Sequence, residues 1–267
     1  MTGDSSPTRV HLQLSLIPLL VLAFAVSAAE PQRPQPLKSA IEFAGESVRN
    51  LQADDFANPG MFWVERGSKL WSEAPGGSGK SCAGCHGDAA KEMKGVAARY
   101  PRIDPGTARL VDLAGRINLC RERNQHEAPL RHESEELLAL TAYVAHQSRG
   151  IPVAVVLDPQ NRKHFERGRD LYYTRIGQLN LACTHCHDQN WGKKLAAETI
   201  SQGHGNAYPA YRLEWQALGS LQRRIRACFY GVRAQVPEYG AQELLDLQLY
   251  LGWRASGLPI ETPGVRR

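Results

Sequence analysis

The chain has 267 residues, of which 32 are Lys or Arg, 27 are Asp or Glu and six are Cys. An apolar content of 42% with only 22% charged residues excludes a disordered chain and indicates one or two globular domains. The net charge of +5 is spread along the chain, which argues against a nucleic-acid-binding stripe and permits at most steering of an acidic partner. Six cysteines in a secreted chain would ordinarily suggest three disulfides, so their positions decide the interpretation.

The first 29 residues are typical of a secretory signal peptide. Arg9 and His11 precede a mostly apolar run over residues 14–26, and small residues follow it. This run has 13 residues, whereas a membrane-spanning helix needs about 20. We therefore predict cleavage after Ala28 or Ala29, a periplasmic mature protein without a membrane anchor, and a compartment in which disulfides are permitted.

An internal duplication organises the rest of the chain. Six landmarks recur in the same order, at offsets of 101 for the first two, 108 for the next two and 107 for the last two. The pairs are Glu65-Arg66-Gly67 and Glu166-Arg167-Gly168; Cys82-Ala-Gly-Cys85-His86 and Cys183-Thr-His-Cys186-His187; Tyr100-Pro101 and Tyr208-Pro209; Arg116-Ile117 with Cys120 and Arg224-Ile225 with Cys228; 136–144 and 243–251; Gly150-Ile151-Pro152 and Gly257-Leu258-Pro259.

We predict a mainly α fold of two tandem cytochrome c-like modules, each with a covalently bound haem. The divisions are a signal peptide (1–29), an N-terminal extension (30–59), a first module (60–150), a linker (151–162) and a second module that contains the active site (163–267). Apolar residues at helical spacing predict helices over 137–144 and 244–251, and the segments 62–71 and 164–173 also look helical. Gly150 and Gly257 are plausible caps, and residues 75–79 are expected to form a loop.

The two Cys-x-x-Cys-His sequences indicate c-type haem attachment. On one helical turn two thiols, Cys82 and Cys85 or Cys183 and Cys186, can form thioethers with a porphyrin, while the next histidine coordinates iron. A zinc site would not require histidine after the second cysteine both times. A redox Cys-x-x-Cys would be expected near a strand–helix pattern that this sequence lacks. The sequence therefore predicts two covalent haem c groups, with His86 and His187 as iron ligands.

A lone cysteine, Cys120 or Cys228, follows each attachment sequence. After signal cleavage only Met61 and Met93 remain as methionines, and the second module has none, so the common His/Met ligation is not available there. We favour thiolate ligation of one iron by Cys120 and of the other by Cys228, with low potentials for both haems. A Cys120–Cys228 disulfide is the alternative, but equivalent positions in two modules need not lie close together.

The remaining histidines carry less weight. His204, in a Gly-His-Gly loop, is the best rival ligand for the second iron, although a solvent-exposed loop histidine is the simpler interpretation. His185 lies inside an attachment sequence and is expected to face solvent. Four other histidines have no spacing that repeats between the modules and are treated as surface or packing residues. These are His126, His132, His146 and His164.

With these residues in view, the whole predicted mature chain resembles the SoxA family, the dihaem c-type cytochrome subunits of the thiosulfate-oxidising Sox system. The resemblance rests on the two attachment sequences with their lone cysteines and on Arg224-x-x-x-Cys228-Phe-Tyr-Gly-Val-Arg233. It also rests on the tail over 254–263 and on the segment 140–150, Leu-Thr-Ala-Tyr-Val-Ala-His-Gln-Ser-Arg-Gly.

The resemblance implies L-cysteine S-thiosulfotransferase activity, in which thiosulfate is coupled oxidatively to a cysteine of a carrier protein. It implies that Cys228 is both haem ligand and catalytic sulfur, found in the family as a persulfide. It also implies two protein partners: a small SoxX-like c-type cytochrome, giving a heterodimer, and a SoxYZ-like sulfur carrier. If its segment is helical, Arg224 lies one turn before Cys228 and could bind the sulfonate of thiosulfate.

Alternatives stay open at this stage. Arg223 and Arg226 rival Arg224, a haem propionate could be its partner, and Arg116 at the matched position of the first module weakens the claim that the arginine is special to catalysis. The chain could also be a plain dihaem electron carrier, a dihaem peroxidase-like enzyme or a haem-bearing interaction subunit. A peroxidase needs one open iron, and a cysteine matched in both modules argues against that.

Overall fold

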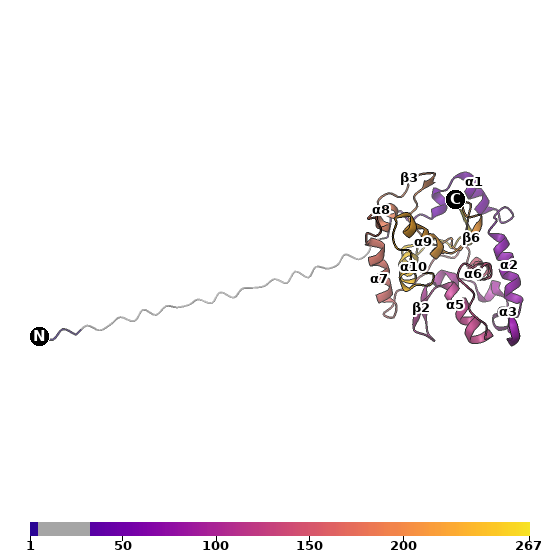
Figure 1. Ribbon diagram of the computed structural model, residues 1–267, viewed down its shortest axis with the longest axis horizontal. Coiled ribbons are helices and arrows are strands. Elements are labelled where there is room, and N and C mark those ends of the chain that lie inside the picture. Colours follow the sequence, from indigo (N-terminus) through magenta and orange to yellow (C-terminus); the bar gives the residue numbers. More distant parts are fainter. Residues whose placement is uncertain (5–32) are drawn as a thin grey trace. The chain divides into compact units, whose positions relative to one another are not determined.

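The computed structural model describes residues 1–4 and 33–267, and residues 33–267 form one compact unit (Figure 1). After its first four residues, the predicted signal peptide lies outside the described residues. Among the described residues, no helix has the length and apolar character needed to cross a membrane.

Helices dominate the fold, as predicted, and short strands connect them. The N-terminal part contains η1 (Ala40–Phe43), α1 (Glu46–Ala53), α2 (Met61–Ser72), η2 (Gly76–Ser78), α3 (Cys82–His86), α4 (Ala89–Glu92), η3 (Ala97–Arg99), β1 (Arg102–Asp104), β2 (Arg109–Val111), α5 (Leu113–Cys120), η4 (Arg121–Gln125) and α6 (Glu135–His146). The C-terminal part contains α7 (Arg162–Tyr173), α8 (Cys183–His187), β3 (Lys194–Leu195), β4 (Glu198–Thr199), β5 (Ala210–Arg212), β6 (Ala217–Gly219), α9 (Leu221–Gly231), α10 (Gln242–Arg254) and β7 (Gly264–Arg266).

Two crossed helix pairs, α2 with α6 and α7 with α10, form the framework of the two halves. The glycine of each Glu-Arg-Gly landmark lies at the crossing. A Cβ on Gly67 would overlap the carbonyl oxygen of Ala139, and a Cβ on Gly168 would overlap that of Asp246. The repeated glycine is therefore explained by the close approach of two helix backbones.

Each half also contributes a short antiparallel hairpin. The strands β1 and β2 pair Arg102 with Val111, and β5 and β6 pair Ala210 with Gly219 in the same register. The second hairpin gains a third strand, because β7 pairs with β5 in parallel. Each hairpin contributes to the core of the other half: Leu110 packs with residues of α7 and α10, and Tyr211 and Leu218 pack with residues of α2 and α6. This exchange explains why one compact unit results.

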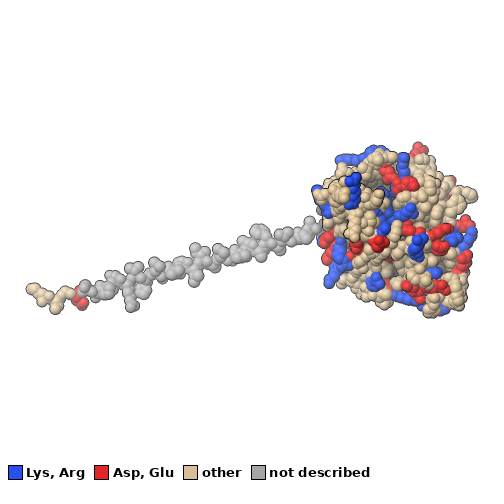
Figure 2. All heavy atoms as spheres, in the orientation of Figure 1, with Lys and Arg blue, Asp and Glu red and all other residues tan. Residues whose placement is uncertain are grey.

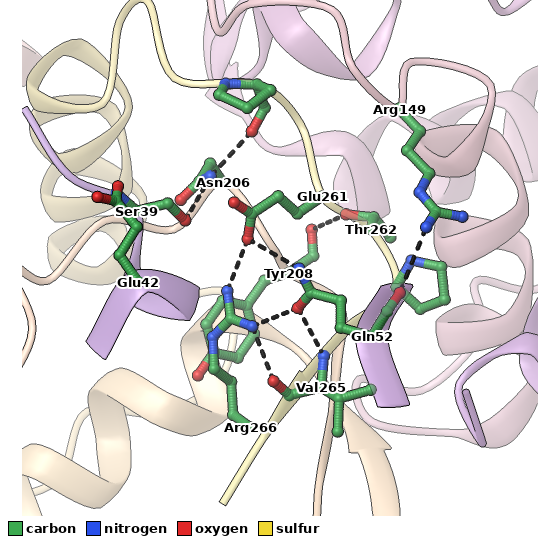
Figure 3. A network of polar contacts seen from close by, with 12 residues as sticks. Ser39, Glu42, Gln52, Arg149, Asn206, Tyr208, Glu261, Thr262, Val265 and Arg266 are labelled. Atoms are coloured by element: carbon green, nitrogen blue, oxygen red, sulfur yellow. Dashed lines mark hydrogen bonds and ion pairs between the residues drawn. The ribbon is translucent and has the colours of Figure 1, made fainter. Parts of the chain in front are cut away.

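The N-terminal extension binds the C-terminal segment (Figure 3). The Gln52 side chain accepts a hydrogen bond from the Val265 amide at 3.0 Å and also contacts Arg266. Arg266 in turn forms an ion pair with Glu261 at 2.8 Å, and Asn206 donates to Ser39 at 3.2 Å. The extension is therefore tied to the C-terminal half of the chain.

Two local expectations need correction. Helices α6 and α10 end at His146 and Arg254, so Gly150 and Gly257 lie beyond the caps; their positive φ values of 80° and 99° serve the following turns. Residues 75–79 are not entirely loop, because Gly76–Ser78 form one turn of 3-10 helix.

Candidate haem sites and reactive cysteine

The two Cys-x-x-Cys-His sequences each form one helical turn, α3 and α8. Ser81 begins α3 by accepting a hydrogen bond from the Gly84 amide at 2.9 Å. His185 plays a related part in α8, since its Nδ1 accepts from the Ala182 amide at 2.9 Å. The expectation that His185 faces solvent is therefore wrong: it is half-buried and stabilises the start of the helix.

In the C-terminal half, the two attachment thiols remain protonated. Burial, together with the nearby Cys228, raises the pKa of Cys183 to about 12, and the same two causes raise the pKa of Cys186. Neutral thiols suit thioether formation better than direct coordination of a metal, for which a thiolate is needed.

Cys228 has the opposite electrostatic environment. Burial alone would raise its pKa, but a hydrogen bond with His187 and the charge on Arg224 hold the pKa below the usual value. Both Arg224 and Cys228 lie on α9, which Ser220 caps by accepting from the Arg223 amide at 3.1 Å. The expected helical turn between Arg224 and Cys228 is therefore present, and the charge of Arg224 makes Cys228 more acidic than an ordinary cysteine.

His187 is oriented as an iron-ligating histidine requires. Its Nδ1 donates to the backbone carbonyl of Ser201 at 2.8 Å, and Gly203 lies against its ring so closely that a Cβ there would be 2.8 Å from the ring carbon. A hydrogen bond from one ring nitrogen to a carbonyl fixes the tautomer and leaves Nε2 free for a metal. His187 and Cys228, the two residues that we expect to bind the same iron, are close enough to influence each other electrostatically.

The expectation that His204 is a solvent-exposed loop histidine is wrong, because its exposed fraction is only 4%. Burial, followed by the charges of Arg254 and His187, lowers the pKa of His204 to about 3, so the ring is neutral. Its Nε2 lies 3.2 Å from Gln202 Oε1, while its Nδ1 is buried without a hydrogen-bond partner among the described residues.

The neighbourhood of α8 holds further unpaired polar atoms. Arg254 is 1% exposed; one of its nitrogens pairs with Asp188 at 2.6 Å, while its Nε has no hydrogen-bond partner in the described chain. The Tyr250 hydroxyl is also buried and unpaired within residues 33–267. Buried polar groups are rarely left unsatisfied, so this half fits an additional polar group such as a haem propionate. With the protonated thiols and the oriented His187, the residues fit a covalent haem.

The N-terminal half is more open. Burial, followed by the nearby Cys120, raises the pKa of Cys82, and Gln125 donates to its sulfur at 3.9 Å. Cys85 and His86 are exposed, and the His86 ring lies 5.7 Å from that of Trp71. Cys120 is therefore close to its own attachment sequence, as Cys228 is to the other, and all six cysteines are free thiols. Met93 packs in the same cluster as Cys82.

The candidate arginines differ in the groups that their guanidiniums contact. Arg116 is paired with Asp104 at 2.5 Å, the guanidinium of Arg223 lies 4.2 Å from the ring centre of Trp215, and that of Arg226 lies 4.1 Å from the ring centre of Tyr239. Arg224 forms no ion pair or side-chain hydrogen bond within the described part of the chain. Of Arg223, Arg224 and Arg226, only Arg224 acts electrostatically on Cys228, whereas the other two lie over aromatic rings, so Arg224 is the best placed of these three for an anion beside Cys228.

The remaining four histidines lie at the surface or in packing contacts, as expected. His126 is exposed at a left-handed turn, and His132 stacks on Tyr239. His146 is half-buried at the end of α6, and burial lowers its pKa. His164 Nδ1 lies 2.6 Å from Asp246, which joins α7 to α10.

The sequence analysis missed Asp104, Arg212 and Arg254. Asp104 and Arg212 could have been found from the offset of 108, which aligns these two residues and assigns them opposite charges. The role of Arg254 depends on burial and on its contact with Asp188, for which the sequence carries no local signal.

Comparisons with known proteins identify the family of the chain. The family model described as SoxA/TsdA, cytochrome c domain, matches residues 66–153. The L-cysteine S-thiosulfotransferase subunit SoxA of Pseudaminobacter salicylatoxidans is 43% identical over 100% of this chain and 92% of its own length. The corresponding subunit of Rhodovulum sulfidophilum is 35% identical over 86% of this chain and 80% of its own length.

A solved structure described as SoxXA from P. pantotrophus has a TM-score of 0.83 and 34% identity, and covers 86% of this chain and 87% of that one. The sequence similarity to the first of these relatives spans the whole chain, and the fold similarity to the solved structure spans 86% of it. The chain therefore belongs to the SoxA family of sulfur-oxidation cytochromes.

Proposed function

We propose that the chain is a periplasmic subunit with two tandem cytochrome c-like modules, 60–150 and 163–267, and two covalent haems. Cys82 and Cys85 would hold the first haem and Cys183 and Cys186 the second. The iron ligands would be His86 with Cys120 and His187 with Cys228. The repeated order of crossed helices, attachment helix, hairpin and cysteine-bearing helix supports the duplication.

The proposed activity is oxidative coupling of thiosulfate to a carrier-protein cysteine. When bound, the haems supply one-electron redox chemistry between the sulfur site and an acceptor cytochrome. Cys228 provides the thiolate, because the positive charge of Arg224 favours its charged form. Arg224 provides a planar donor group for the sulfonate oxygens of the dianion.

The proposed reaction has two steps. The Cys228 thiolate and the terminal sulfur of thiosulfate form an S–S bond, which gives Cys228–S–S–SO3⁻ and releases two electrons to the acceptor. A thiolate of the carrier then attacks the sulfur next to Cys228, which transfers the S–SO3⁻ group and returns Cys228 as a thiolate. The Cys228 thiolate is the sulfur that is coupled in the first step and the leaving group that is displaced in the second.

The partners follow from the relatives. The similar solved structure is described as SoxXA, which supports a heterodimer with a small SoxX-like cytochrome. A SoxYZ-like protein is the proposed carrier. The observation that carries the proposal is that Arg224, which has no ion pair among the described residues, lies one helical turn before Cys228 on α9, so that a cation for a sulfur dianion stands beside a thiol.

The test replaces Cys228 with alanine and uses Cys120→Ala as the matched control. With both haems retained, Cys228→Ala should abolish thiosulfate-dependent reduction of an acceptor cytochrome, and Cys120→Ala should leave most of it. Mass spectrometry of the intact wild-type protein should find two covalent haems and, after thiosulfate treatment, added sulfur on Cys228. Continued thiosulfate-dependent turnover by Cys228→Ala would contradict the assignment of Cys228 as the reacting sulfur.

A further inference from the structure

An irregular segment, residues 201–204, holds the ring of His187. The Nδ1 of His187 donates to the Ser201 carbonyl at 2.8 Å, and Gly203 packs against the ring. The segment belongs to no helix or strand, and within residues 33–267 its backbone groups form no hydrogen bond with other backbone groups. Side-chain contacts must therefore fix the position of the segment and, through it, the orientation of the ring.

Gln202 makes these side-chain contacts. Its side chain is fully buried, its Oε1 accepts a hydrogen bond from the backbone N–H of Lys38 at 2.8 Å, and its Nε2 donates to the carbonyl of Pro36 at 2.8 Å. Both ends of the amide are thus paired with one stretch of backbone, which holds the side chain in a single orientation. Gln202 lies between Ser201 and Gly203, so its displacement would move both residues that contact the His187 ring.

The stretch of backbone that Gln202 binds is the N-terminal strap, residues 36–39. Its Leu37 side chain packs against the largest hydrophobic cluster of the protein. Its Ser39 hydroxyl accepts a hydrogen bond from the Asn206 side chain at 3.2 Å, just beyond the segment that holds the histidine (Figure 3). The strap follows the predicted signal peptide (1–29), so it stays in the mature chain. It is therefore a fixed support on which the Gln202 amide can rest.

The N-terminal half has no such support. Gly95 and Gly203 lie 108 positions apart and share a positive φ, 74° and 76°, which aligns Lys94 with Gln202. Lys94 is exposed, and a Cβ on Gly95 would meet nothing of the His86 ring within 4 Å. His86 is itself exposed. Burial of the histidine and the paired amide therefore occur together, in the C-terminal half alone.

We propose that Gln202 is a positioning residue for His187, and that the N-terminal strap is the element that holds Gln202 in place. The strap fixes the amide, the amide fixes residues 201–204, and the segment fixes the ring through the Ser201 carbonyl and Gly203. Groups that orient a ligating histidine through its second ring nitrogen control the geometry of the metal bond. This inference rests on the proposed function, in which His187 binds iron, and gives the N-terminal extension a part in it.

The test uses electron paramagnetic resonance of the ferric, haem-loaded, full-length mature protein. The wild type should give two low-spin signals, one for each haem. Gln202→Ala should shift and broaden one of them, because the g values of a low-spin haem depend on the orientation of its axial ligands. The other signal should stay in place and serves as the internal control. Lys94→Ala, the matched variant in the N-terminal half, should leave both signals unchanged.

A second pair of variants isolates the hydrogen bond from the strap. Lys38→Pro removes the backbone N–H that donates to Gln202 and should shift the same signal as Gln202→Ala does. Lys38→Ala keeps this N–H, removes only the rest of the side chain and should give the wild-type spectrum. If Gln202→Ala does not fold, the comparison of the two Lys38 variants decides the proposal by itself.

Each outcome has one interpretation. Variants Gln202→Ala and Lys38→Pro that unfold at lower urea concentration but keep both wild-type signals would show a purely structural role and overturn the proposal. The signals require no sulfur chemistry. A shifted signal in these variants, together with a wild-type protein that does not reduce an acceptor with thiosulfate, would therefore contradict the proposed function and support the role of Gln202.

Discussion

The two attachment helices α3 and α8 share a sequence pattern and a length but differ in their surroundings. His86 and Cys85 on α3 are exposed, and the nearest aromatic neighbour of His86 is Trp71. His187 on α8 is half-buried, hydrogen-bonded to the Ser201 carbonyl and packed against Gly203. The difference comes from the longer segment between α8 and β5, which covers one histidine and has no equivalent over the other.

The two halves share a framework and differ in their charges. The helix crossings, hairpin registers and cysteine positions are common to both halves, whereas the last residue of the first hairpin strand is Asp104 in one half and Arg212 in the other. Positive and negative side chains are otherwise interspersed on the visible face of the compact unit (Figure 2). The proposed difference in activity between the halves therefore depends on a few buried side chains.

The largest expected effect is on activity. Arg224→Gln should lower kcat/KM for thiosulfate by about 100-fold, because it removes a charged donor from the sulfonate without altering the haem attachment residues. Arg116→Gln should change it by less than about twofold, since Arg116 pairs with Asp104 instead. Steady-state reduction of an acceptor cytochrome measures both. Equal losses in the two variants would show that the halves are not functionally different.

The helix crossings should respond alike in the two halves. Gly168→Ala and Gly67→Ala should each lower the free energy of unfolding by about 2 to 3 kcal/mol, because the added methyl group overlaps a backbone carbonyl of the crossing helix. Gly77→Ala, where a Cβ would meet nothing within 4 Å, is the control. Denaturant unfolding monitored by far-ultraviolet circular dichroism gives the values, and an effect confined to one half would contradict the shared framework.

A smaller effect is expected at Asp104. Hydrogen bonds from Arg123 and Thr107 lower the pKa of this buried carboxyl to about 2, from an ordinary value near 3.8. Its stabilising effect is therefore fully present above pH 3.8 and is lost as the pH falls toward 2. Asp104→Asn should cost about 1.5 kcal/mol at pH 7 and should remove part of the acid sensitivity. Unfolding midpoints in urea at pH 5 and pH 3 test this, and an unchanged pH dependence would disprove it.

The sequence predicts the features that repeat. The attachment helices, the helical segments of α2, α6, α7 and α10 and the helical turn from Arg224 to Cys228 all follow from local spacing, and the structure contains them, whereas the crossing of those helices appears only in the structure. The burial of His204 and the pairing of Arg116 could not be predicted, because both depend on residues brought together by tertiary packing. Gly150 and Gly257 show the limit of local signals: a glycine after a helix indicates a turn but does not fix the residue at which the helix ends.

The contact between the N-terminal extension and the C-terminal strand has a consequence for the order in which the protein folds. Gln52 lies 213 residues before its partner Val265, so the helix that contains it cannot gain this contact until residue 265 has been synthesised. An isolated helix of eight residues has little stability of its own in water. Helix α1 therefore takes up its final place only after strand β7 is available, and removal of residues 264–266 would take away the contact that holds it.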